Sequence, residues 1–390
     1  MLSQLKDRIE CVRGVTYKAS SDLHPSLDEN SITLLRANNI QDGRISFDDV
    51  QYVDKSKVKK KQTLRKGDIL ICASSGSKNL VGKAALVQSD LEATFGAFCC
   101  VVRPTEINQY YLGHYFRSAT YRRAIEAAST GTNINNLKPD NFRTLLVPEI
   151  PEGEQAAIAM KLDCILEQVS LEKSCLHKLD ELVKSRFVEM FGDPIDESSP
   201  WPKLAIKDFC TLKIGPFGSS LHKQDYITGG RPLVNPSHIV DGKIVPANDL
   251  TISEEKYQEM EAYHLEPGDV VLGRRGEIGR CAVVYSSGYL CGTGSMIVRP
   301  SDKCRPDYLQ RVLSFPSFKD ALERNAVGQT MKNLNAKIVG QAVVALPSIN
   351  AQNEFAAFVQ QVEKLEFETQ QAIDKLQTLY DSLAQEYFGD

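Results

Sequence analysis

The sequence predicts a mixed α/β protein in which two globular units alternate with two long helices. Three observations carry this prediction. First, residues 108–193 align without a gap with residues 305–390, so the chain contains an internal repeat. Second, the end of each copy has apolar residues at the alternating three- and four-residue spacing of a helical seam. Third, the remainder of each copy contains short β-prone runs bounded by turn residues.

The repeat is a duplication of a whole module. Both copies close on the same tripeptide, Phe191-Gly192-Asp193 and Phe388-Gly389-Asp390, and further back Asp42-Gly43 pairs with Asp241-Gly242. The period far exceeds the ~20–50 residues of solenoid repeats. We therefore predict two similar surfaces related by a pseudo-two-fold axis, which suits duplex DNA or a pair of identical subunits. The predicted parts are globular units at 1–150 and 194–346 and long helices at 151–193 and 347–390.

Composition restricts the class of protein. The chain is 42% hydrophobic and 25% charged, as in ordinary globular proteins. No apolar run approaches the ~20 residues of a membrane span, and the charged start lacks a signal-peptide core, so we expect a cytosolic protein without membrane contact. The ten cysteines include no C-x-x-C pair, which favours reduced and mostly buried thiols over zinc ligands.

Charge is divided between the two kinds of unit. The net charge of −4 consists of +5 for residues 1–150, −4 for 151–193, +1 for 194–346 and −6 for 347–390. Phosphate attraction is therefore expected on the globular units and not on the helices. A basic face of this size is equally compatible with an ordinary solvated surface.

The helical segments predict an antiparallel coiled coil. In the seam from Ile158 to Met190, eight of ten positions are apolar, and the same holds for apolar or aromatic residues from Phe355 to Tyr387. The first helix is expected from about Glu154 to Phe191, roughly 55 Å long. Paired with the second helix, it would act as a spacer, and about 50 Å corresponds to roughly 15 base pairs of duplex DNA. The alternative is that each helix packs on its own globular unit.

Each globular unit is expected to contain many short strands followed by a helix. The turn signals Asp42-Gly43 and Asp241-Gly242 predict hairpins. The expected strands in the first unit are 31–40, 43–53, 69–73, 84–87 and 97–102, with a helix over 108–128. In the second unit they are 232–239, 242–246, 270–273, 281–285 and 295–298, with a helix near 306–326.

Candidate binding residues come from loops in which the two copies differ. The loop after the Gly-Asp strand is serine- and glycine-rich in the first copy and has three arginines in the second. Arginine suits guanine and phosphate, and amide side chains suit adenine edges. The same residue types are equally common in solvated turns and helix caps, so this alternative stays open. The candidate DNA contacts are Arg36, Asn38, Asn39, Lys78, Lys83, Asn133 and Asn135 in the first unit, and Ser219, Ser220, Lys223, Asn235, His238, Arg274, Arg275, Arg280, Gln329 and Lys332 in the second.

Motifs for catalysis are missing from the sequence. It contains no phosphate-binding G-x-x-x-x-G-K-[ST] loop, no H-E-x-x-H zinc motif and no G-x-S-x-G nucleophile elbow. The six histidines are scattered, and none has metal-ligand spacing with a carboxylate. The sequence therefore favours a recognition protein over an enzyme.

A series of local motifs, repeated in the same order, resembles the specificity subunits of bacterial type I restriction-modification systems. The resemblance covers nearly the whole chain, with one small departure at Ala351-Gln352-Asn353-Glu354, where Glu-Gln is usual. The motifs are Leu34-Leu35-Arg36-Ala37-Asn38-Asn39-Ile40, Lys66-Gly67-Asp68-Ile69-Leu70, Gly215-Pro216-Phe217-Gly218-Ser219-Ser220, Pro267-Gly268-Asp269-Val270-Val271, Gly276-Glu277-Ile278-Gly279, and Glu154-Gln155 with Ala351-Gln352 at the helix starts.

The resemblance implies two target-recognition domains that each read one half of an asymmetric, bipartite DNA site. It implies that the paired helices set the gap and dock two methyltransferase subunits. S-adenosylmethionine, ATP and Mg would then belong to the methyltransferase and restriction-translocase partners, with no cofactor in this chain. The alternatives are the recognition portion of a fused restriction-methyltransferase enzyme and a coiled-coil scaffold without a DNA role.

Overall fold

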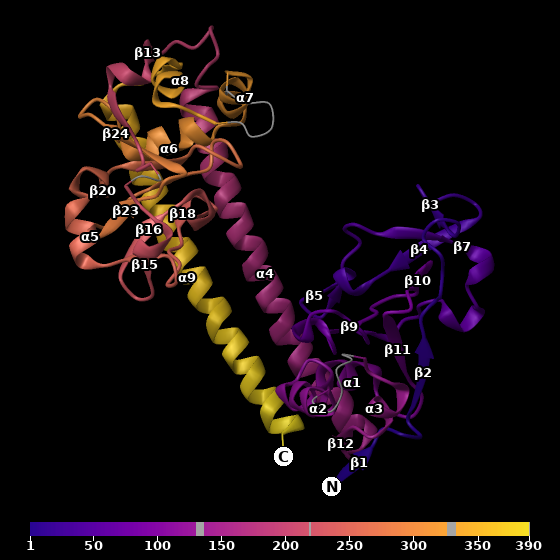
Figure 1. The fold of residues 1–390 in the computed structure, drawn as a ribbon. Helices are drawn as coiled ribbons and strands as arrows, with labels where there is room; N and C mark the ends of the chain where they lie inside the picture. Colours follow the sequence, from indigo (N-terminus) through magenta and orange to yellow (C-terminus); the bar gives the residue numbers. More distant parts are fainter. Residues whose placement is uncertain (130–135, 218–219, 326–332, 390) are drawn as a thin grey trace. The chain divides into compact units, whose positions relative to one another are not determined.

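The computed structural model describes residues 1–129, 136–217, 220–325 and 333–389 (Figure 1). Contacts divide the chain into two compact units. Unit 1 consists of Met1–Ser174 and Gln370–Asp390, and unit 2 is Cys175–Thr369. Each long helix therefore contributes one part to each unit. The predicted mixed α/β fold is confirmed.

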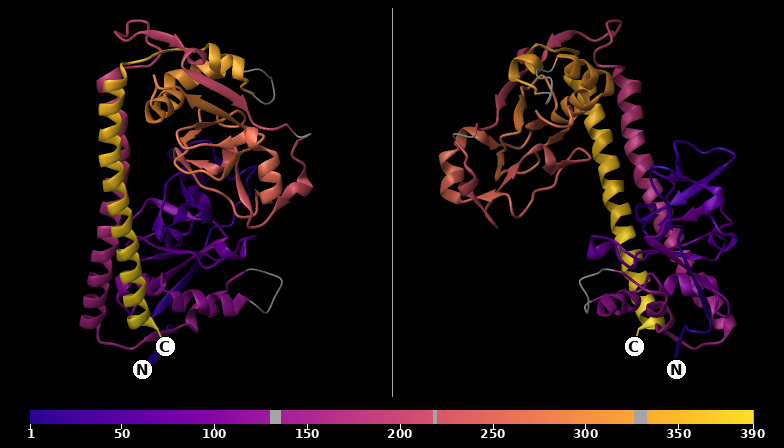
Figure 2. Two further views of the ribbon diagram at one scale, coloured as in Figure 1. Left: turned by 90° about the vertical axis from the view of Figure 1, so that its left-hand side faces the viewer. Right: turned by 45° about the vertical axis from the view of Figure 1, so that its right-hand side comes forward.

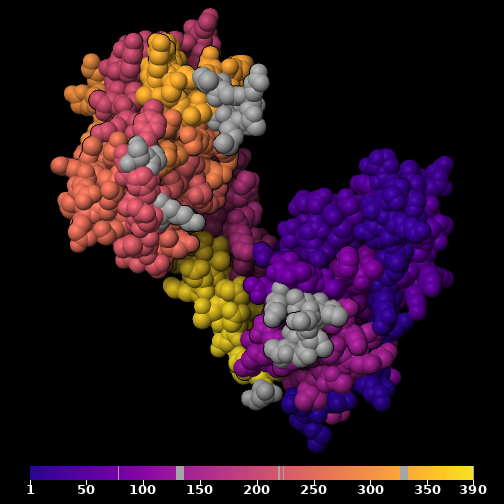
Figure 3. Space-filling model, viewed as in Figure 1, coloured from indigo at the N-terminus to yellow at the C-terminus, as the bar shows by residue number. Residues whose placement is uncertain are grey.

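Unit 1 contains two four-stranded sheets. One has the order β2-β11-β8-β9 and is antiparallel; the other, β10-β4-β7-β3, contains the parallel pair β4–β10. The shorter pairs are β1–β12 and β5–β6. The strands are β1 (Leu2–Gln4), β2 (Ile9–Arg13), β3 (Leu23–His24), β4 (Ser31–Leu35), β5 (Ile40–Gln41), β6 (Arg44–Ile45), β7 (Gln51–Asp54), β8 (Ile69–Cys72), β9 (Ala84–Leu86), β10 (Ala93–Phe95), β11 (Cys99–Pro104) and β12 (Leu146–Pro148). The helices are α1 (Gln109–Tyr115), α2 (Ala119–Ser129) and α3 (Pro139–Arg143). In the space-filling view, residues 1–100 (indigo to purple) form one continuous body (Figure 3).

Unit 2 has a corresponding arrangement. Its antiparallel sheet β14-β24-β21-β22 has the order of β2-β11-β8-β9, and its second sheet, β15-β19-β16-β23-β20, contains the parallel pair β16–β23. The shorter pairs are β13–β25 and β17–β18. The strands are β13 (Lys203–Ala205), β14 (Cys210–Ile214), β15 (Tyr226–Ile227), β16 (Arg231–Val234), β17 (Ile239–Val240), β18 (Lys243–Ile244), β19 (Thr251–Ile252), β20 (His264–Leu265), β21 (Val270–Gly273), β22 (Cys281–Val283), β23 (Tyr289–Cys291), β24 (Ser295–Pro300) and β25 (Val343–Ala345). The helices are α5 (Glu254–Glu259), α6 (Pro306–Ser314), α7 (Pro316–Asn325) and α8 (Ala336–Gln341).

The hairpin signals were located correctly, but the strands around them are shorter than predicted. Asp42 and Asp241 have φ of 47° and 48°, and the glycines that follow have 71° and 73°, as a tight hairpin turn requires. The predicted strand 31–40 is interrupted by the 3-10 turn Ala37–Asn39, and the predicted helix near 306–326 is split into α6 and α7 at Pro316. Proline cannot donate the backbone hydrogen bond that would continue α6.

The long helices are α4 (Glu152–Phe191) and α9 (Ile349–Phe388). In unit 2 the end of α4 lies beside the start of α9 (Figure 2), where the Phe187 and Phe191 rings are 5.5 Å and 5.6 Å from the Phe355 ring. In unit 1, buried His114 of α1 contacts both helices through Tyr380 Oη at 2.9 Å and Asp163 Oδ1 at 3.1 Å. The seam side chains of both helices thus belong to the cores of the units as well.

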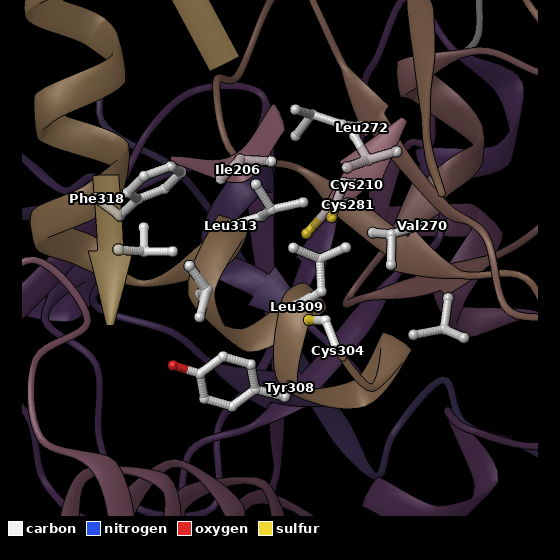
Figure 4. Close-up of a cluster of buried hydrophobic side chains, with 14 of the residues drawn as sticks. Ile206, Cys210, Val270, Leu272, Cys281, Cys304, Tyr308, Leu309, Leu313 and Phe318 are labelled. Atoms are coloured by element: carbon white, nitrogen blue, oxygen red, sulfur yellow. The ribbon is translucent and has the colours of Figure 1, made fainter. Parts of the chain in front are cut away.

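The main core of unit 2 lies between its antiparallel sheet and α6 (Figure 4). It contains Val270, Leu272, Tyr308 and Leu309, and Phe187 of α4 packs into the same cluster. The corresponding core of unit 1 joins Ile69, Ile71, Tyr111 and Leu112 to Leu162 of α4 and to Tyr380, Ala384 and Phe388 of α9. Burial of these apolar side chains, at roughly 25 cal/mol per Å², is the main stabilising contribution.

Both antiparallel sheets contain a buried carboxylate held by an arginine. Asp68 accepts bonds from Arg103 Nε at 2.7 Å and Nη2 at 2.8 Å, and Asp269 accepts from Arg299 at 2.6 Å and 2.9 Å. Each aspartate side chain is 1% exposed, while Arg103 is 12% and Arg299 39% exposed. The Asp68 side chain holds the pKa of Arg103 above its usual value. The repeated Gly-Asp motif therefore has a structural role.

The glutamine near the start of each long helix also has a structural role. Gln352 is fully buried; its Oε1 accepts from Arg305 N at 2.7 Å, and its Nε2 donates to Lys303 O and Pro347 O at 3.1 Å and 2.8 Å. Gln155 makes the matching bonds to Asn108 N and Ile150 O, both at 2.9 Å. The amide ties the first turn of each helix to the loop before α1 or α6.

We expect Gln352→Ala to destabilise the protein by about 2–3 kcal/mol, because it leaves one buried N–H and two carbonyls without their partner. Urea unfolding followed by circular dichroism measures the change. The neighbouring exposed Asn353 provides the control, and Asn353→Ala is expected to remain within about 0.5 kcal/mol. Equal stability of the two variants would contradict this role for Gln352.

Among the described residues, no helix is both long and apolar enough to cross a membrane, and no group of three or more His, Cys, Asp and Glu side chains could hold a metal ion. The ten cysteines are free thiols, and only Cys164 and Cys175 are exposed. Burial raises the pKa of Cys11 to about 11 and of Cys210 to about 12, so these thiols stay protonated near neutral pH.

Candidate nucleic-acid interface

Three of the predicted loops meet in unit 1. Ala73 N and Ser74 N donate to Phe98 O at 2.9 Å and 3.0 Å, and Leu137 N donates to Ala73 O at 2.7 Å. Gly96 N donates to Leu35 O at 3.0 Å, which brings the turn before β11 against the segment that leads to Arg36. We call the segments 36–39, 73–83, 96–98 and 136–137 the first loop cluster.

A groove of about 470 Å³ opens in the first loop cluster. Side chains from loops far apart in the sequence line it, and they combine a guanidinium, amides, hydroxyls and two aromatic rings. This mixture of hydrogen-bonding and apolar groups is suited to the edges of nucleobases. The lining side chains include Tyr17, Arg36, Asn38, Gln51, Ser74, Ser75 and Phe98.

The predicted residues of the segment 36–39 differ in accessibility. Asn38 is exposed and Arg36 is partly exposed; both donate to Asp49 Oδ2 at 3.0 Å. Asn39 is fully buried, and its amide is occupied by Arg36 N at 2.9 Å and Asp48 O at 2.8 Å. A base contact by Asn39 would require those bonds to break, so Asn39 has a structural role in the turn. Lys83 is exposed on the loop after β8.

The same three loops meet in unit 2. Arg274 N donates to Gly294 O at 2.9 Å, and Leu334 N donates to Arg274 O at 3.0 Å. Arg280 Nη1 donates to Pro236 O at 3.3 Å. We call the segments 235–238, 273–280, 292–294 and 333–334 the second loop cluster. The correspondence extends to individual backbone bonds, since Ala73 and Arg274 make the same donation and accept from the equivalent Leu137 and Leu334.

Two predicted contacts in the second loop cluster are buried. Arg274 is 5% exposed and donates from Nε to Leu334 O at 2.8 Å; burial, together with the charge of Arg275, lowers its pKa. His238 is 6% exposed, and its Nδ1 lies 2.7 Å from Leu233 O. The side chains of Arg274 and His238 hold the loops together, which corrects their prediction as surface contacts.

Other predicted residues of unit 2 are accessible. Arg275 and Ser220 are exposed, and Asn235 is partly exposed. Arg280 is partly exposed and bonded to Glu277 at 2.5 Å, and this contact lowers the pKa of Glu277. In the second loop cluster, the Arg275 side chain is therefore exposed, and its guanidinium is accessible to a ligand.

Several predicted contacts cannot be placed. Asn133, Asn135, Ser219, Gln329 and Lys332 lie outside the described residues, and the side chains of Lys78 and Lys223 are also outside the description. Their assignment remains a prediction.

Sequence reasoning missed three side chains of the groove. Phe98 falls inside the predicted strand 97–102, yet it lies before β11 and is 71% exposed. Gly96, two residues earlier, is the signal that a turn interrupts this strand. Tyr17 and Gln51 lie in segments without any motif; Tyr17 Oη lies 3.4 Å from Gln51 Oε1.

Comparison with known proteins finds a family of DNA specificity domains and several related subunits. The family described as the type I restriction modification DNA specificity domain matches residues 198–378. The specificity subunit of the type I restriction enzyme EcoKI, from Escherichia coli K12, is 29% identical over 403 residues, covering 97% of this chain and 86% of that protein. Residues 198–378 therefore belong to this family of DNA specificity domains, and the whole chain is similar to type I specificity subunits. The StySPI specificity subunit of Salmonella potsdam is 41% identical over 174 residues, or 44% of this chain and 37% of that protein.

Solved structures agree with this assignment at the level of the fold. A chain from a type I restriction-modification assembly aligns over 100% of this chain and 98% of its own length, with a TM-score of 0.60 and 18% identity. The S subunit from M. genitalium aligns over 100% and 96%, with a TM-score of 0.54 and 15% identity.

Proposed function

We propose that this chain is a specificity subunit that reads a bipartite, asymmetric DNA site, with each loop cluster contacting one half. The observation that carries the proposal is the repeated convergence of the same three loops, with the same backbone bonds and different side chains. The first loop cluster offers Arg36, Asn38 and Ser75, whereas the second offers Arg275 and Asn235. Equivalent positions with different chemistry are what two readers of unequal half-sites need.

The globular segments 1–150 and 194–346 then act as target-recognition domains. The long helices act as a spacer and as the docking surface for two methyltransferase subunits. Apolar side chains that are exposed on both helices support docking, among them Met160, Leu171 and Phe367. The pairing of Phe187 with Phe355 at opposite ends of the two helices supports an antiparallel coiled coil with a pseudo-two-fold axis. The polar seam residues Glu172, Glu366 and Thr369 would set its register.

We assign the catalytic steps and their cofactors to the partner subunits. S-adenosylmethionine would be bound by the methyltransferase subunits, and ATP with Mg by the restriction-translocase subunits, leaving this chain without a cofactor. The small net charge of the globular units fits such an assembly, because partner subunits would supply further phosphate contacts.

The proposal is tested by sequencing the methylated sites of a host that expresses this chain with its partner subunits. A split motif with two specified halves and an unspecified gap is expected. A continuous motif would contradict the division of reading between the two clusters. The fused-enzyme alternative is tested separately, since appreciable binding of S-adenosylmethionine by the isolated chain would favour it.

We expect Arg275→Ala to relax specificity only in the half-site read by unit 2. Loss of one arginine contact to a base or phosphate should weaken binding about 5- to 100-fold on the cognate duplex. Binding of the assembled complex to duplexes altered in one half or the other measures the effect. Arg65→Ala, an exposed arginine of unit 1 outside the loop clusters, is the control. Equal loss of specificity at both halves would count against modular reading.

A further inference from the structure

Phe98 is an exposed aromatic side chain on a hydrogen-bonded turn. It lies between β10 and β11 and is 71% exposed, although its backbone oxygen is fixed by Ala73 N and Ser74 N. Exposure of a large apolar side chain is unfavourable, because burying it would contribute roughly 1.5–3 kcal/mol. The Phe98 ring is therefore exposed to solvent and does not contribute to a hydrophobic core.

The neighbours of Phe98 indicate what the ring would contact. It lines the same groove as Arg36, Asn38 and Ser75. Arginine and asparagine read base edges in the major groove, where the 5-methyl group of thymine is the apolar feature and phenylalanine is one of the side chains that contact it. Apolar wedges that separate stacked bases act mainly from the minor groove. The polar neighbours thus favour a methyl contact over a wedge.

The second loop cluster lacks this group. Gly294 takes the position of Phe98, since its oxygen accepts from Arg274 N as Phe98 O accepts from Ala73 N. A Cβ atom at Gly294 would lie 3.0 Å from Cδ of Pro236, so a side chain there would require Pro236 to shift by a few tenths of an ångström. At this position of the turn, the apolar side chain is therefore present in unit 1 and absent from unit 2.

We propose that Phe98 is a specificity-determining residue that packs against the 5-methyl group of a thymine in the half-site read by unit 1. This inference rests on the proposed function, because it requires the first loop cluster to face the major groove. It makes one base of that half-site recognisable without a hydrogen bond.

The test uses the chain assembled with its methyltransferase subunits and cognate duplexes in which each thymine of the half-site is replaced in turn by deoxyuridine. This replacement removes only the methyl group. Wild-type binding should weaken about four- to tenfold at one position, the effect of one buried methyl or methylene group. Phe98→Ala should weaken binding to the unmodified duplex by at least as much and should be insensitive to deoxyuridine at that position.

Phe98→Leu, which keeps an apolar side chain, should retain part of the sensitivity to the methyl group. Phe47→Ala is the matched control, because Phe47 is 52% exposed in the same unit but does not line the groove. If no thymine position matters, or if Phe98→Ala keeps the full deoxyuridine effect, the assignment is overturned. The proposed function fails separately, if the wild-type complex does not prefer the cognate duplex over a random one.

Discussion

Removing one heptad from each long helix is expected to shorten the gap of the DNA site by about three base pairs and to leave both half-sites unchanged. The matched segments are Leu171–His177 of α4 and Glu368–Asp374 of α9. Seven residues of helix span about 10.5 Å, and duplex DNA rises about 3.4 Å per base pair. Because both seams lose a whole repeat, the remaining apolar positions keep their register. Binding to the original site should fall towards the non-specific level, a loss of about 10³-fold or more.

The measurement is selection from a duplex library with a variable gap, or sequencing of the methylated sites in vivo. Deleting the segment from α4 alone is the control, and it should abolish specific binding at every gap length because the two seams no longer match. An unchanged gap after the paired deletion would exclude the helices as the spacer, and altered half-sites would exclude independent reading heads.

Asp68→Ala is expected to destabilise unit 1 by about 3–5 kcal/mol, because it leaves the largely buried Arg103 with only the exposed Glu10, 4.0 Å away, as a counter-charge. Asp269→Ala should have a smaller effect on unit 2, because Arg299 is 39% exposed and can be solvated. Urea unfolding distinguishes the two. Circular dichroism follows the whole chain, and the single tryptophan, Trp201, packs against the core of unit 2 and reports on that unit.

The surface pair Asp140–Arg143 provides the control for the buried pairs. Asp140 is 83% exposed, so Asp140→Ala should change the free energy of unfolding by less than about 1 kcal/mol. The expectation for Asp68 is refuted if its variant unfolds at the same urea concentration as Asp140→Ala. A larger effect at Asp269 than at Asp68 would show that exposure of the arginine does not control the outcome.

The features that the sequence predicted well are those with strong local signals. The apolar run Val270–Gly273 is β21 to the residue, and the Asp-Gly turns are in their predicted places. The strand β10 was missed because three residues, Ala93–Phe95, carry no periodicity. Its parallel pairing with β4 depends on contacts about sixty residues apart in the sequence, which no local pattern contains.

The candidate site was predicted at the level of loops and less well at the level of side chains. Comparing the copies identified three of the loops that meet in each cluster and missed the turns 96–98 and 292–294. It could not separate Arg275, which is exposed, from Arg274, which is buried, because adjacent residues in a loop have no fixed periodicity of exposure. For the same reason Asn38 and Asn39 look equivalent in sequence, although only Asn38 reaches the surface.

The division of α9 between the two units affects the order in which the units are completed during synthesis. Residues 370–390 complete unit 1, and Phe388 packs against Tyr111 and Tyr115, which leave the ribosome long before it. At roughly 5–20 residues per second, synthesis of unit 2 in between takes on the order of ten to forty seconds. During that interval the nascent unit 1 exposes part of its aromatic core, and unit 2 is complete before unit 1 is. Translation errors or stops near residue 370 should therefore damage the half of the protein that was made first.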